Sequence, residues 1–507
     1  MDSNDVRALI REGARHGIRL WVEDGELHYE APKGNMLASL RTALQSRKAE
    51  LIGELSQPVF RKRGAAPGPV SYPVFWQDFW RETQANLSLS NTTHFAIRLS
   101  GDVSLERIES ALQCLAHRYD LLRSRVRLVD GTLCLVLEDQ VAPPMDVMDV
   151  SSDYSSERLL RLQTLVEKAV YTPFEDGQIY RARIIKISAN EYIIAIVIHH
   201  FVADAVSCKI LTGQLIAALR DKDSHLKERP LQYSDYLLAM NEWLSGRGLT
   251  YRLAYWRAKM RQAPPVRFPL THEPSSIATA RLDSLTIHIN GALRAHVARA
   301  SSEAQVPLAV VLLAAKFGAL FHTLKSGDLV VHWTHAGRDD PKLLELVGMT
   351  VNCVPIRVSV LPQMSYAELL AKVNDTYLQA RGYQVPWGLL MRTLEETGVS
   401  AIAPLFNFLP GKRTPKRSGA SLPQQAASLV FEHVIVKRPE DTNSVEWKSH
   451  EFTVVDSGEE MLVSVKYMPS RFQAATIRQF ASAFLSCLEM IAKNPTRPLG
   501  DARRTAS

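Results

Sequence analysis

The segment from Tyr192 to Asp204 sets the strongest limit on what this chain can fold into. Residues 192–198, Tyr-Ile-Ile-Ala-Ile-Val-Ile, form a short uncharged apolar run, as buried strands do. Two histidines end the run, a short turn follows, and residues 208–220 are predicted to be helical. A buried strand that leads through a turn into a helix is typical of an α/β protein.

Predicted strands and helices alternate along the rest of the chain, which is too long to fold around a single hydrophobic core. With 507 residues, the chain is expected to form two large lobes and a small additional unit. We predict α/β lobes over residues 71–245 and 246–507. The clearest predicted elements are strands at 93–99, 181–187, 329–334 and 460–467 and helices at 105–118, 155–170, 291–303 and 307–320.

Residues 1–55 are predicted to form the small unit. A helix over 5–16 precedes strands at 18–22 and 26–30, and Asp24-Gly25 between them favours a tight hairpin turn. An exposed hairpin edge can accept a strand from a partner protein. On pattern alone, an ordinary folding cap is an equally good interpretation.

Composition excludes several classes of protein. No apolar run approaches the roughly 20 residues of a membrane span, and the acidic start lacks the apolar core of a secretory signal. We therefore expect no membrane attachment and a cytoplasmic location. Residues 56–70 hold three prolines and two glycines and are interpreted as a linker.

Charge and cysteine content exclude further classes of protein. The net charge of +7 includes basic clusters at 61–63 and 412–417, both in loop-like sequence that lacks interleaved aromatic residues. This pattern favours solvated loops over a nucleic-acid surface, and an acidic protein partner suits the positive balance better. The five scattered cysteines are interpreted as reduced.

His199 and His200, at the end of the apolar strand, are the candidates for chemistry. Neighbouring strand residues point to opposite faces, so one histidine faces a given cavity and the other is free to pack. An imidazole, with an unperturbed pKa of about 6.5, can accept or orient a proton near neutral pH. Asp204, at the mouth of the next helix, can pair with an arginine and hold the loop. His-x-x-x-Asp could also chelate a metal, but local spacing supplies no further ligand, so no metal is expected.

This segment resembles the core motif of nonribosomal peptide synthetase condensation domains, His-His-x-x-x-Asp-Gly-x-Ser. Here the motif reads His199, His200, Asp204 and Ser207, with Ala205 in place of the glycine. The resemblance runs from about residue 68 to the C-terminus. Further family motifs are echoed in order by Phe75-Trp-Gln-Asp-Phe-Trp80, Arg118 to Val126, Tyr233-Ser-Asp-Tyr236, Ala336-Gly-Arg338, Val347-Gly-Met-Thr-Val-Asn-Cys353 and Pro404-Leu-Phe-Asn-Phe408.

The N-terminal unit is similar to the β-hairpin docking domains that precede some condensation domains. Arg19-Leu-Trp-Val22 and Ala31-Pro-Lys-Gly34 carry this likeness. It implies that residues 1–55 capture the C-terminal tail of an upstream carrier-bearing protein by strand addition. The implied contacts are Arg19, Trp21 and Lys33.

The resemblance also implies the fold and the reaction. The expected fold is α/β, with two chloramphenicol-acetyltransferase-like lobes in a V-shaped pseudo-dimer around a central tunnel. His200 is then the catalytic residue that assists an amine or hydroxyl acceptor as it attacks a carrier-bound polyketide or peptidyl thioester. The chain itself binds no cofactor, because the substrate arrives on the carrier's phosphopantetheine arm. The acceptor is a small molecule or a second carrier, and the product is an amide or an ester, which a soluble acceptor would release.

The resemblance gives roles to further residues. Arg338 is expected to pair with Asp204, and Asn407 lies either near the reaction centre or in an ordinary strand. His199 and Ser207 are expected to support the motif, and Ala205, Thr350 and Asn352 to border the tunnel. Ala205 would narrow the tunnel, and Thr350 would make its acceptor side more polar. Two alternatives stay open: a coenzyme-A-dependent acyltransferase of the same superfamily, and a noncatalytic module that recruits carrier proteins.

Overall fold

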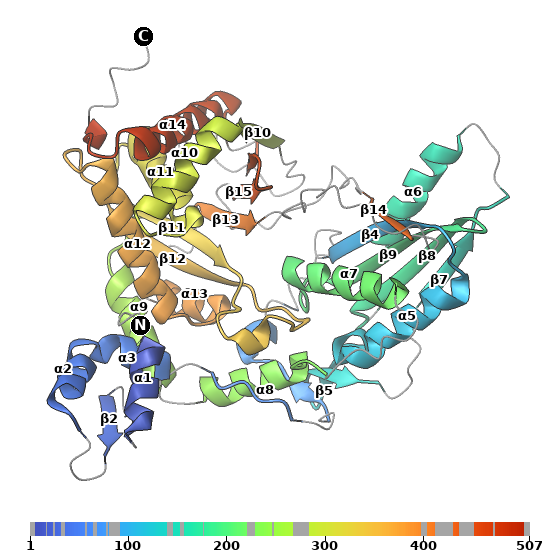
Figure 1. Ribbon diagram of the computed structural model, residues 1–507, viewed down its shortest axis with the longest axis horizontal. Helices are drawn as coiled ribbons and strands as arrows, with labels where there is room; N and C mark the ends of the chain where they lie inside the picture. Colours follow the sequence, from blue (N-terminus) through green and yellow to red (C-terminus); the bar gives the residue numbers. More distant parts are fainter. Residues whose placement is uncertain are drawn as a thin grey trace, which may run out of the picture.

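The computed structural model comprises two α/β lobes side by side and a small N-terminal unit beside the second lobe (Figure 1). It describes residues 6–16, 18–23, 26–31, 36–55, 58–63, 68–77, 80, 92–138, 145–152, 157–175, 177–220, 229–245, 248–266, 283–396, 403–410, 429–434, 451–469 and 472–500.

The main sheet of the first lobe has the strand order β14-β4-β9-β8-β7. Its central strand is the apolar run of the sequence, and alternate residues of that run enter different cores. Ile194 and Ile196 face α5 and α7, whereas Ile193 and Ala195 face α6. Helices therefore cover both faces. The bounds are β4 Thr92–Ser100, β7 Met145–Asp149, β8 Tyr180–Ser188, β9 Glu191–His199, α5 Leu105–Arg118, α6 Arg158–Tyr171 and α7 Ala205–Arg220.

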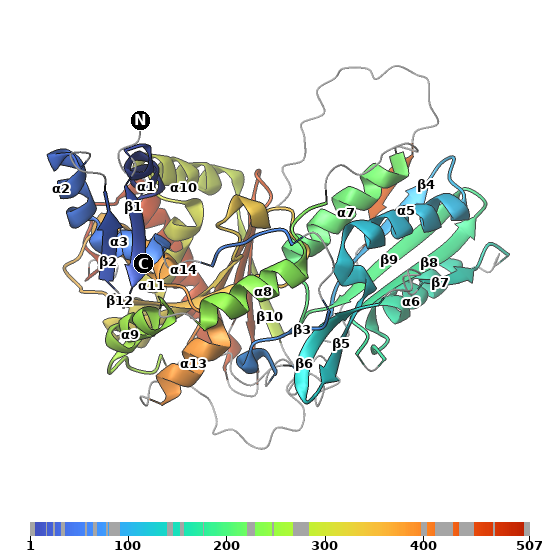
Figure 2. The ribbon, with the colours of Figure 1, turned by 90° about the horizontal axis from the view of Figure 1, so that it is seen from below.

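A smaller sheet of the first lobe has the order β3-β6-β5. Its β5–β6 hairpin turns at Asp130 and Gly131, both with positive φ, as tight hairpin turns require. The sheet lies at the end of the lobe where α8 begins (Figure 2). The bounds are β3 Val70–Ser71, β5 Ser124–Val129, β6 Thr132–Leu137 and α8 Tyr233–Leu244.

Strand β14 (Val430–His433) joins the sheet of the first lobe although it comes from the far end of the chain. It pairs antiparallel with β4 and covers the edge that β4 would otherwise expose. Glu432 lies 3.7 Å from Arg98, and the Arg220 guanidinium lies 5.2 Å from the centre of the Phe431 ring. The two lobes are thus connected by more than α8 and the chain that follows it.

The second lobe contains a sheet of order β10-β16-β15-β13-β11-β12. Helices α10, α11, α12 and α14 share one apolar core with this sheet, and α11 is buried over most of its length. The sheet lies between these helices and the first lobe (Figures 1 and 2). The bounds are β10 Asp283–Ile289, β11 Asp328–His335, β12 Asn352–Ser359, β13 Leu405–Pro410, β15 Glu451–Asp456, β16 Met461–Tyr467, α9 Gly248–Met260, α10 Gly291–Glu303, α11 Leu308–Leu324, α12 Tyr366–Gly382, α13 Trp387–Glu395 and α14 Ala474–Lys493.

The N-terminal unit has its own small core, made by Ile18, Leu40, Leu44 and Leu51. Its hairpin is the two-stranded sheet β1-β2, which lies beside the second lobe and away from the first (Figures 1 and 2). The bounds are α1 Val6–Arg15, β1 Arg19–Glu23, β2 Glu26–Glu30, α2 Ala38–Ser46 and α3 Lys48–Leu55.

Part of the segment interpreted as a linker packs against the first lobe. Phe60 is 6% exposed and its ring stacks on Tyr236 of α8 at 5.5 Å. The backbone amide of Arg63 donates to Asp235 at 3.2 Å. The described residues 58–63 are therefore anchored to α8, and proline content alone did not indicate this.

The element predictions agree with the structure to within a few residues. The helices at 105–118 and 291–303 have the predicted bounds, but α7 begins at Ala205 and not at Cys208. Among the described residues, no single helix is long and apolar enough to cross a bilayer. Helices α10 and α11 reach that length together, but they meet at an angle of 107°.

Candidate active site

The two histidines lie where β9 ends and the chain turns toward α7. His199 closes the strand: its amide donates to Ile179 O at 2.8 Å, and its carbonyl accepts from Val202 N at 3.0 Å. His199 is 5% exposed, whereas His200 is exposed. The predicted division of the pair into one packed and one accessible imidazole is therefore present.

His199 packs among aromatic rings. Its ring centre lies 5.1 Å from that of Trp80 and 5.9 Å from that of Phe174. The backbone amide of Phe201 donates to His199 Nδ1 at 3.1 Å, so this nitrogen carries no proton. Burial, and to a lesser extent the adjacent His200, lower the pKa of His199 to about 4. His199 is therefore a neutral packing residue at physiological pH.

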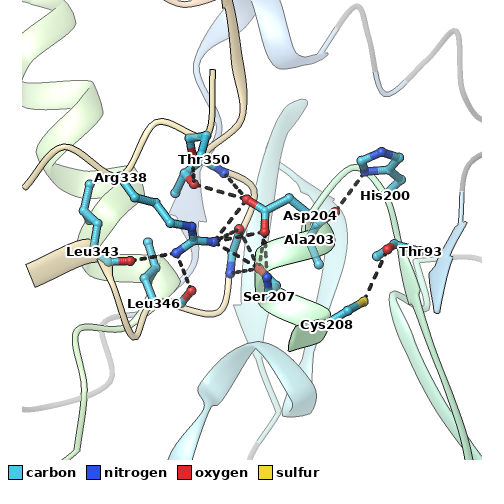
Figure 3. A network of polar contacts seen from close by, with 12 residues as sticks. Thr93, His200, Ala203, Asp204, Ser207, Cys208, Arg338, Leu343, Leu346 and Thr350 are labelled. Atoms are coloured by element: carbon cyan, nitrogen blue, oxygen red, sulfur yellow. Dashed lines mark hydrogen bonds and ion pairs between the residues drawn. The ribbon is translucent and has the colours of Figure 1, made fainter. Parts of the chain in front are cut away.

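His200 points away from the polar network of the adjacent loop, toward the side where Thr93 lies (Figure 3). Its Nδ1 lies 2.9 Å from the carbonyl oxygen of Ala203. A carbonyl only accepts hydrogen bonds, so Nδ1 carries the proton of the neutral ring and Nε2 keeps its lone pair. This contact fixes both the tautomer and the orientation of the ring. The exposed His200 ring is therefore held in one orientation directly after the end of β9.

Asp204 is completely buried and accepts hydrogen bonds on both carboxylate oxygens. Oδ1 accepts from Ser207 N at 2.7 Å, which satisfies a free amide at the start of α7 as an N-cap residue does. Arg338 Nη2 donates to Oδ1 at 3.0 Å and to Oδ2 at 3.1 Å. The expected pair between Asp204 and Arg338 is present, and its side chains are only 1% and 4% exposed.

Arg338 connects this pair to a loop of the second half of the chain. Its Nη1 donates to Leu343 O at 2.7 Å and to Leu346 O at 2.6 Å (Figure 3). The preceding Gly337 has φ +67°, and a Cβ there would lie 1.9 Å from Thr350 O. A side chain at position 337 would therefore displace the backbone that carries the arginine. The Ala-Gly-Arg motif needs its glycine for a steric reason that the sequence did not reveal.

Ser207 and Thr350 complete the network around Asp204. Ser207 Oγ accepts from Gly348 N at 3.0 Å and lies 2.8 Å from Asp204 Oδ1. Thr350 is 3% exposed; its hydroxyl lies 3.1 Å from Asp204 Oδ2 and 2.8 Å from Ala336 O. This placement corrects the expectation that Thr350 adds polarity to an open tunnel wall, because the hydroxyl is used inside the network.

Asn352 and Ala205, both expected to border the tunnel, lie at the starts of different elements. Asn352 begins β12, donates from Nδ2 to Val385 O at 2.8 Å and accepts from Trp387 N at 2.9 Å. It therefore fixes the chain between α12 and α13. Ala205 is the first residue of α7 and is exposed.

Asn407 lies on the face of the second sheet opposite α11 and α12, the face on which Trp387 of α13 packs against His332 at 4.5 Å. Its neighbours Phe406 and Val454 enter the core, whereas Asn407 and its β15 partner Thr453 are partly exposed. This face lies on the side of the first lobe (Figure 1).

The predicted docking residues lie partly outside the described residues. Arg19 and Trp21 belong to β1, opposite Glu30 and His28 of β2, but their side chains are not described. Lys33 lies outside the described residues altogether. Among the described strands, neither β1 nor β2 pairs with a third strand.

Sequence reasoning did not assign roles to Trp80, Gly348 or Ala203. Trp80 packs on His199, and Ala203 supplies the carbonyl that orients His200. A Cβ at Gly348 would lie 2.3 Å from the Tyr233 ring. Glycine at a motif position is a sequence signal of such a close approach, and it could have identified Gly348. The role of a backbone carbonyl such as that of Ala203 does not depend on residue type, so the sequence carries no signal for it.

Comparison with known proteins adds family evidence to this geometry. The Condensation domain model matches residues 80–506, and the TubC N-terminal docking domain model matches residues 6–57. One of the linear gramicidin synthase proteins of Brevibacillus parabrevis is 25% identical over 472 residues, which cover 91% of this chain and 9% of that protein. The chain thus spans less than a tenth of the length of this relative.

Solved structures of similar fold include the condensation domain described for chain release from the enacyloxin polyketide synthase. It has a TM-score of 0.69 and 20% identity, and the match covers 100% of this chain and 97% of that one. The EpoB cyclization-docking bidomain from Sorangium cellulosum has a TM-score of 0.67 and 15% identity, with 97% and 99% coverage. Since the family model covers residues 80–506, the chain belongs to the condensation domain family, with a TubC-type docking domain at its N-terminus.

Proposed function

We propose that this protein transfers a polyketide or peptidyl chain from a carrier-protein thioester to an amine or hydroxyl acceptor supplied in trans. Condensation domains form amide or ester bonds. The observation that supports catalysis in this chain is the contact of 2.9 Å between His200 Nδ1 and Ala203 O. In the neutral ring this contact assigns the lone pair to Nε2 on an exposed side chain, which is the arrangement that a general base requires.

In the proposed reaction, the acceptor attacks the thioester carbonyl, and His200 Nε2 takes the acceptor's proton. The new C–N or C–O bond forms, the C–S bond breaks, and the proton passes from the imidazolium to the leaving thiolate. For a neutral amine, orientation contributes more than proton removal, because the amine is already nucleophilic. For a hydroxyl acceptor, base assistance matters more. Asp204 and Arg338 hold the loop and do not touch substrate.

Two further features support the proposed routes by which the carrier-bound substrates reach the protein. The sheet face that carries the half-buried Asn407 lies on the side of the first lobe, which suits a tunnel between the lobes that admits phosphopantetheine arms. Asn352 and Ala205 then lie along its approaches. The docking domain suits capture of the C-terminal tail of an upstream carrier protein through residues 1–55, with Arg19, Trp21 and Lys33 as contacts.

Chain release is part of the proposal. The enacyloxin structure, whose match covers this whole chain, is described as mediating chain release. By analogy, a soluble alcohol or amine acceptor would leave with the finished chain as its ester or amide. A carrier-bound acceptor would instead keep the product attached to the assembly line.

The test is intact-mass analysis of a loaded upstream carrier incubated with the protein and a panel of amines and alcohols. We expect one acceptor to discharge the carrier, and His200→Ala to slow that discharge by about 10²- to 10⁴-fold. His117→Ala, which changes an exposed histidine of α5, is the matched control and should keep the wild-type rate.

The same assay distinguishes the alternatives. Equal rates for His200→Ala and the wild type would refute catalysis by His200 and leave carrier recruitment as the function. Acyl transfer from coenzyme A at the rate of transfer from the carrier would favour a coenzyme-A-dependent acyltransferase and contradict the proposed donor.

A further inference from the structure

A buried arginine joins the docking domain to the body of the protein. Arg252 of α9 is 0% exposed. Its Nη2 donates to the carbonyl of Gly53, in α3 of the docking domain, at 2.5 Å. Its Nη1 donates to Gly382 O at 2.9 Å and Gln384 O at 3.0 Å. One guanidinium therefore holds the docking domain and the end of α12 at the same time.

The two backbones approach closely at this point. A Cβ on Gly53 would lie 3.2 Å from Gly382 O, closer than most carbon–oxygen contacts of a side chain. The Arg252 guanidinium also lies 5.6 Å from the centre of the Trp243 ring. A buried guanidinium with these partners requires all of them in place, since an unpaired buried charge is strongly disfavoured.

Four consecutive carbonyls at the end of α12 and just after it accept hydrogen bonds from side chains of other elements. Arg252 binds the carbonyls of 382 and 384, and Trp256 Nε1 donates to the carbonyl of 383 at 2.7 Å. Asn352 Nδ2 donates to the carbonyl of 385 at 2.8 Å. The last carbonyls of a helix lack partners within the helix and need external donors. Residues 382–385, which we call the relay segment, receive theirs from α9 and from the motif of residues 347–353.

A second connection joins the relay segment to Arg338. Gln384 Nε2 donates to Asp339 Oδ2 at 3.3 Å, and Arg381 Nη2 donates to Asp339 Oδ1 at 2.6 Å. Asp339 directly follows the arginine that binds Asp204. The motif of residues 347–353 is a third connection. Its Thr350 hydroxyl donates to Asp204, and its Asn352 side-chain amide donates to Val385 O of the relay segment.

We propose that Arg252 is a positioning residue, through which the seating of the docking domain on α12 sets the geometry of the loop that carries His200. The relay segment carries this effect to Asn352 and Asp339, and from there to the Asp204–Arg338 pair. A docking domain seated on the body supplies the Gly53 carbonyl to Arg252 Nη2. A displaced domain leaves the guanidinium without Gly53 O and loosens the relay segment. The kinetic part of this inference rests on the proposed acyl transfer, and the structural part does not.

The test displaces the docking domain without changing Arg252. Gly53→Leu places a branched side chain against Gly382 O. Gly213→Leu is the matched control, because Gly213 lies in helix α7 and its added Cβ meets no atom within 4 Å. Hydrogen exchange is followed at the amides of Thr350 and Trp387, which donate to Asp204 and Asn352. We expect faster exchange at both amides in Gly53→Leu and wild-type exchange in Gly213→Leu.

Kinetics with a small soluble thioester, which does not use the docking domain, supply the second readout. We expect kcat with this donor to fall about tenfold in Gly53→Leu, as a misplaced catalytic group causes. Arg252→Met should reproduce the effect, and Arg252→Lys should recover part of it, because lysine keeps the charge but not the fork of donors.

Wild-type exchange at Thr350 and Trp387 in a folded Gly53→Leu protein would overturn the inference. Faster exchange at both amides in a protein that transfers no acyl group from any donor would support the coupling and refute the proposed function. The two claims therefore fail separately.

Discussion

The carboxylate of Asp204 and the guanidinium of Arg338 meet at 3.0 Å although 134 residues separate them in the chain. Asp204 belongs to the turn that carries His200, and Arg338 belongs to a loop that follows β11 of the second lobe. Leu343, Leu346 and Val347 of that loop enter the core of the first lobe. The pair therefore joins the two halves of the chain directly beside the candidate base.

Removing one member of this pair should destabilise the protein more than removing both. Asp204→Asn or Arg338→Met leaves one buried charge unpaired, and each should lower the free energy of unfolding by about 3–5 kcal/mol. The double variant removes both charges and should recover part of that loss. Urea denaturation of the four proteins measures this difference. Strictly additive losses would show that the two side chains are not coupled.

Gly337→Ala should disrupt the same pair for a steric reason. The added methyl would lie 1.9 Å from Thr350 O at a residue with φ +67°. Strain and the clash together should cost about 3 kcal/mol in thermal or urea unfolding.

Gly131→Ala is the control for this clash, since Gly131 also has positive φ but an added Cβ there meets nothing within 4 Å. We expect Gly131→Ala to lower the free energy of unfolding by about 1 kcal/mol, from the backbone conformation alone. Equal losses in the two variants would mean that the contact with Thr350 has no part in the effect.

His199 should make the protein sensitive to acid. Its pKa is about 4 in the folded protein and near the ordinary value of about 6.5 in the unfolded chain. Between these values the unfolded chain binds a proton that the folded one does not, so stability falls as pH falls through this window, by about 3 kcal/mol in all.

His199→Asn keeps an acceptor for the Phe201 amide and does not titrate. Its free energy of unfolding should therefore fall less between pH 6.5 and 4 than that of the wild type. Urea denaturation at several pH values measures the difference. Parallel pH profiles would contradict the assigned pKa.

Lys316 should make stability rise at alkaline pH. Its side chain is 0% exposed, it donates to Leu405 O at 2.7 Å, and burial lowers its pKa well below the ordinary value. The unfolded chain keeps this lysine protonated up to a pH of about 10, so it binds more protons than the folded chain, and stability increases with pH in this range.

Lys316→Met should remove this increase between pH 7 and 10, as measured by denaturant unfolding. Lys209→Met, which changes an exposed residue of α7, should retain it. An unchanged increase in Lys316→Met would assign the effect to other groups.

Local patterns predicted the part of the site that a single strand determines. Alternation along a strand predicted that one histidine of the pair packs and the other is accessible, because the two faces of a strand differ. The choice of His200 as the accessible one came from the resemblance. The partner of Asp204 came from resemblance to a family, since no local rule connects residues so far apart in the chain. The relay segment was not predicted at all, because its backbone carbonyls carry no residue-type signal. Thr350 was misplaced for a similar reason: its residue type shows polarity but not direction.

Strand β14 implies an order of events during synthesis. The ribosome produces β4 long before residues 430–433, so a nascent first lobe exposes one unpaired strand edge until nearly the whole chain has emerged. A gene split between the lobes would leave that edge open to other chains. Co-expression of both fragments would then be needed to obtain the first lobe without aggregation.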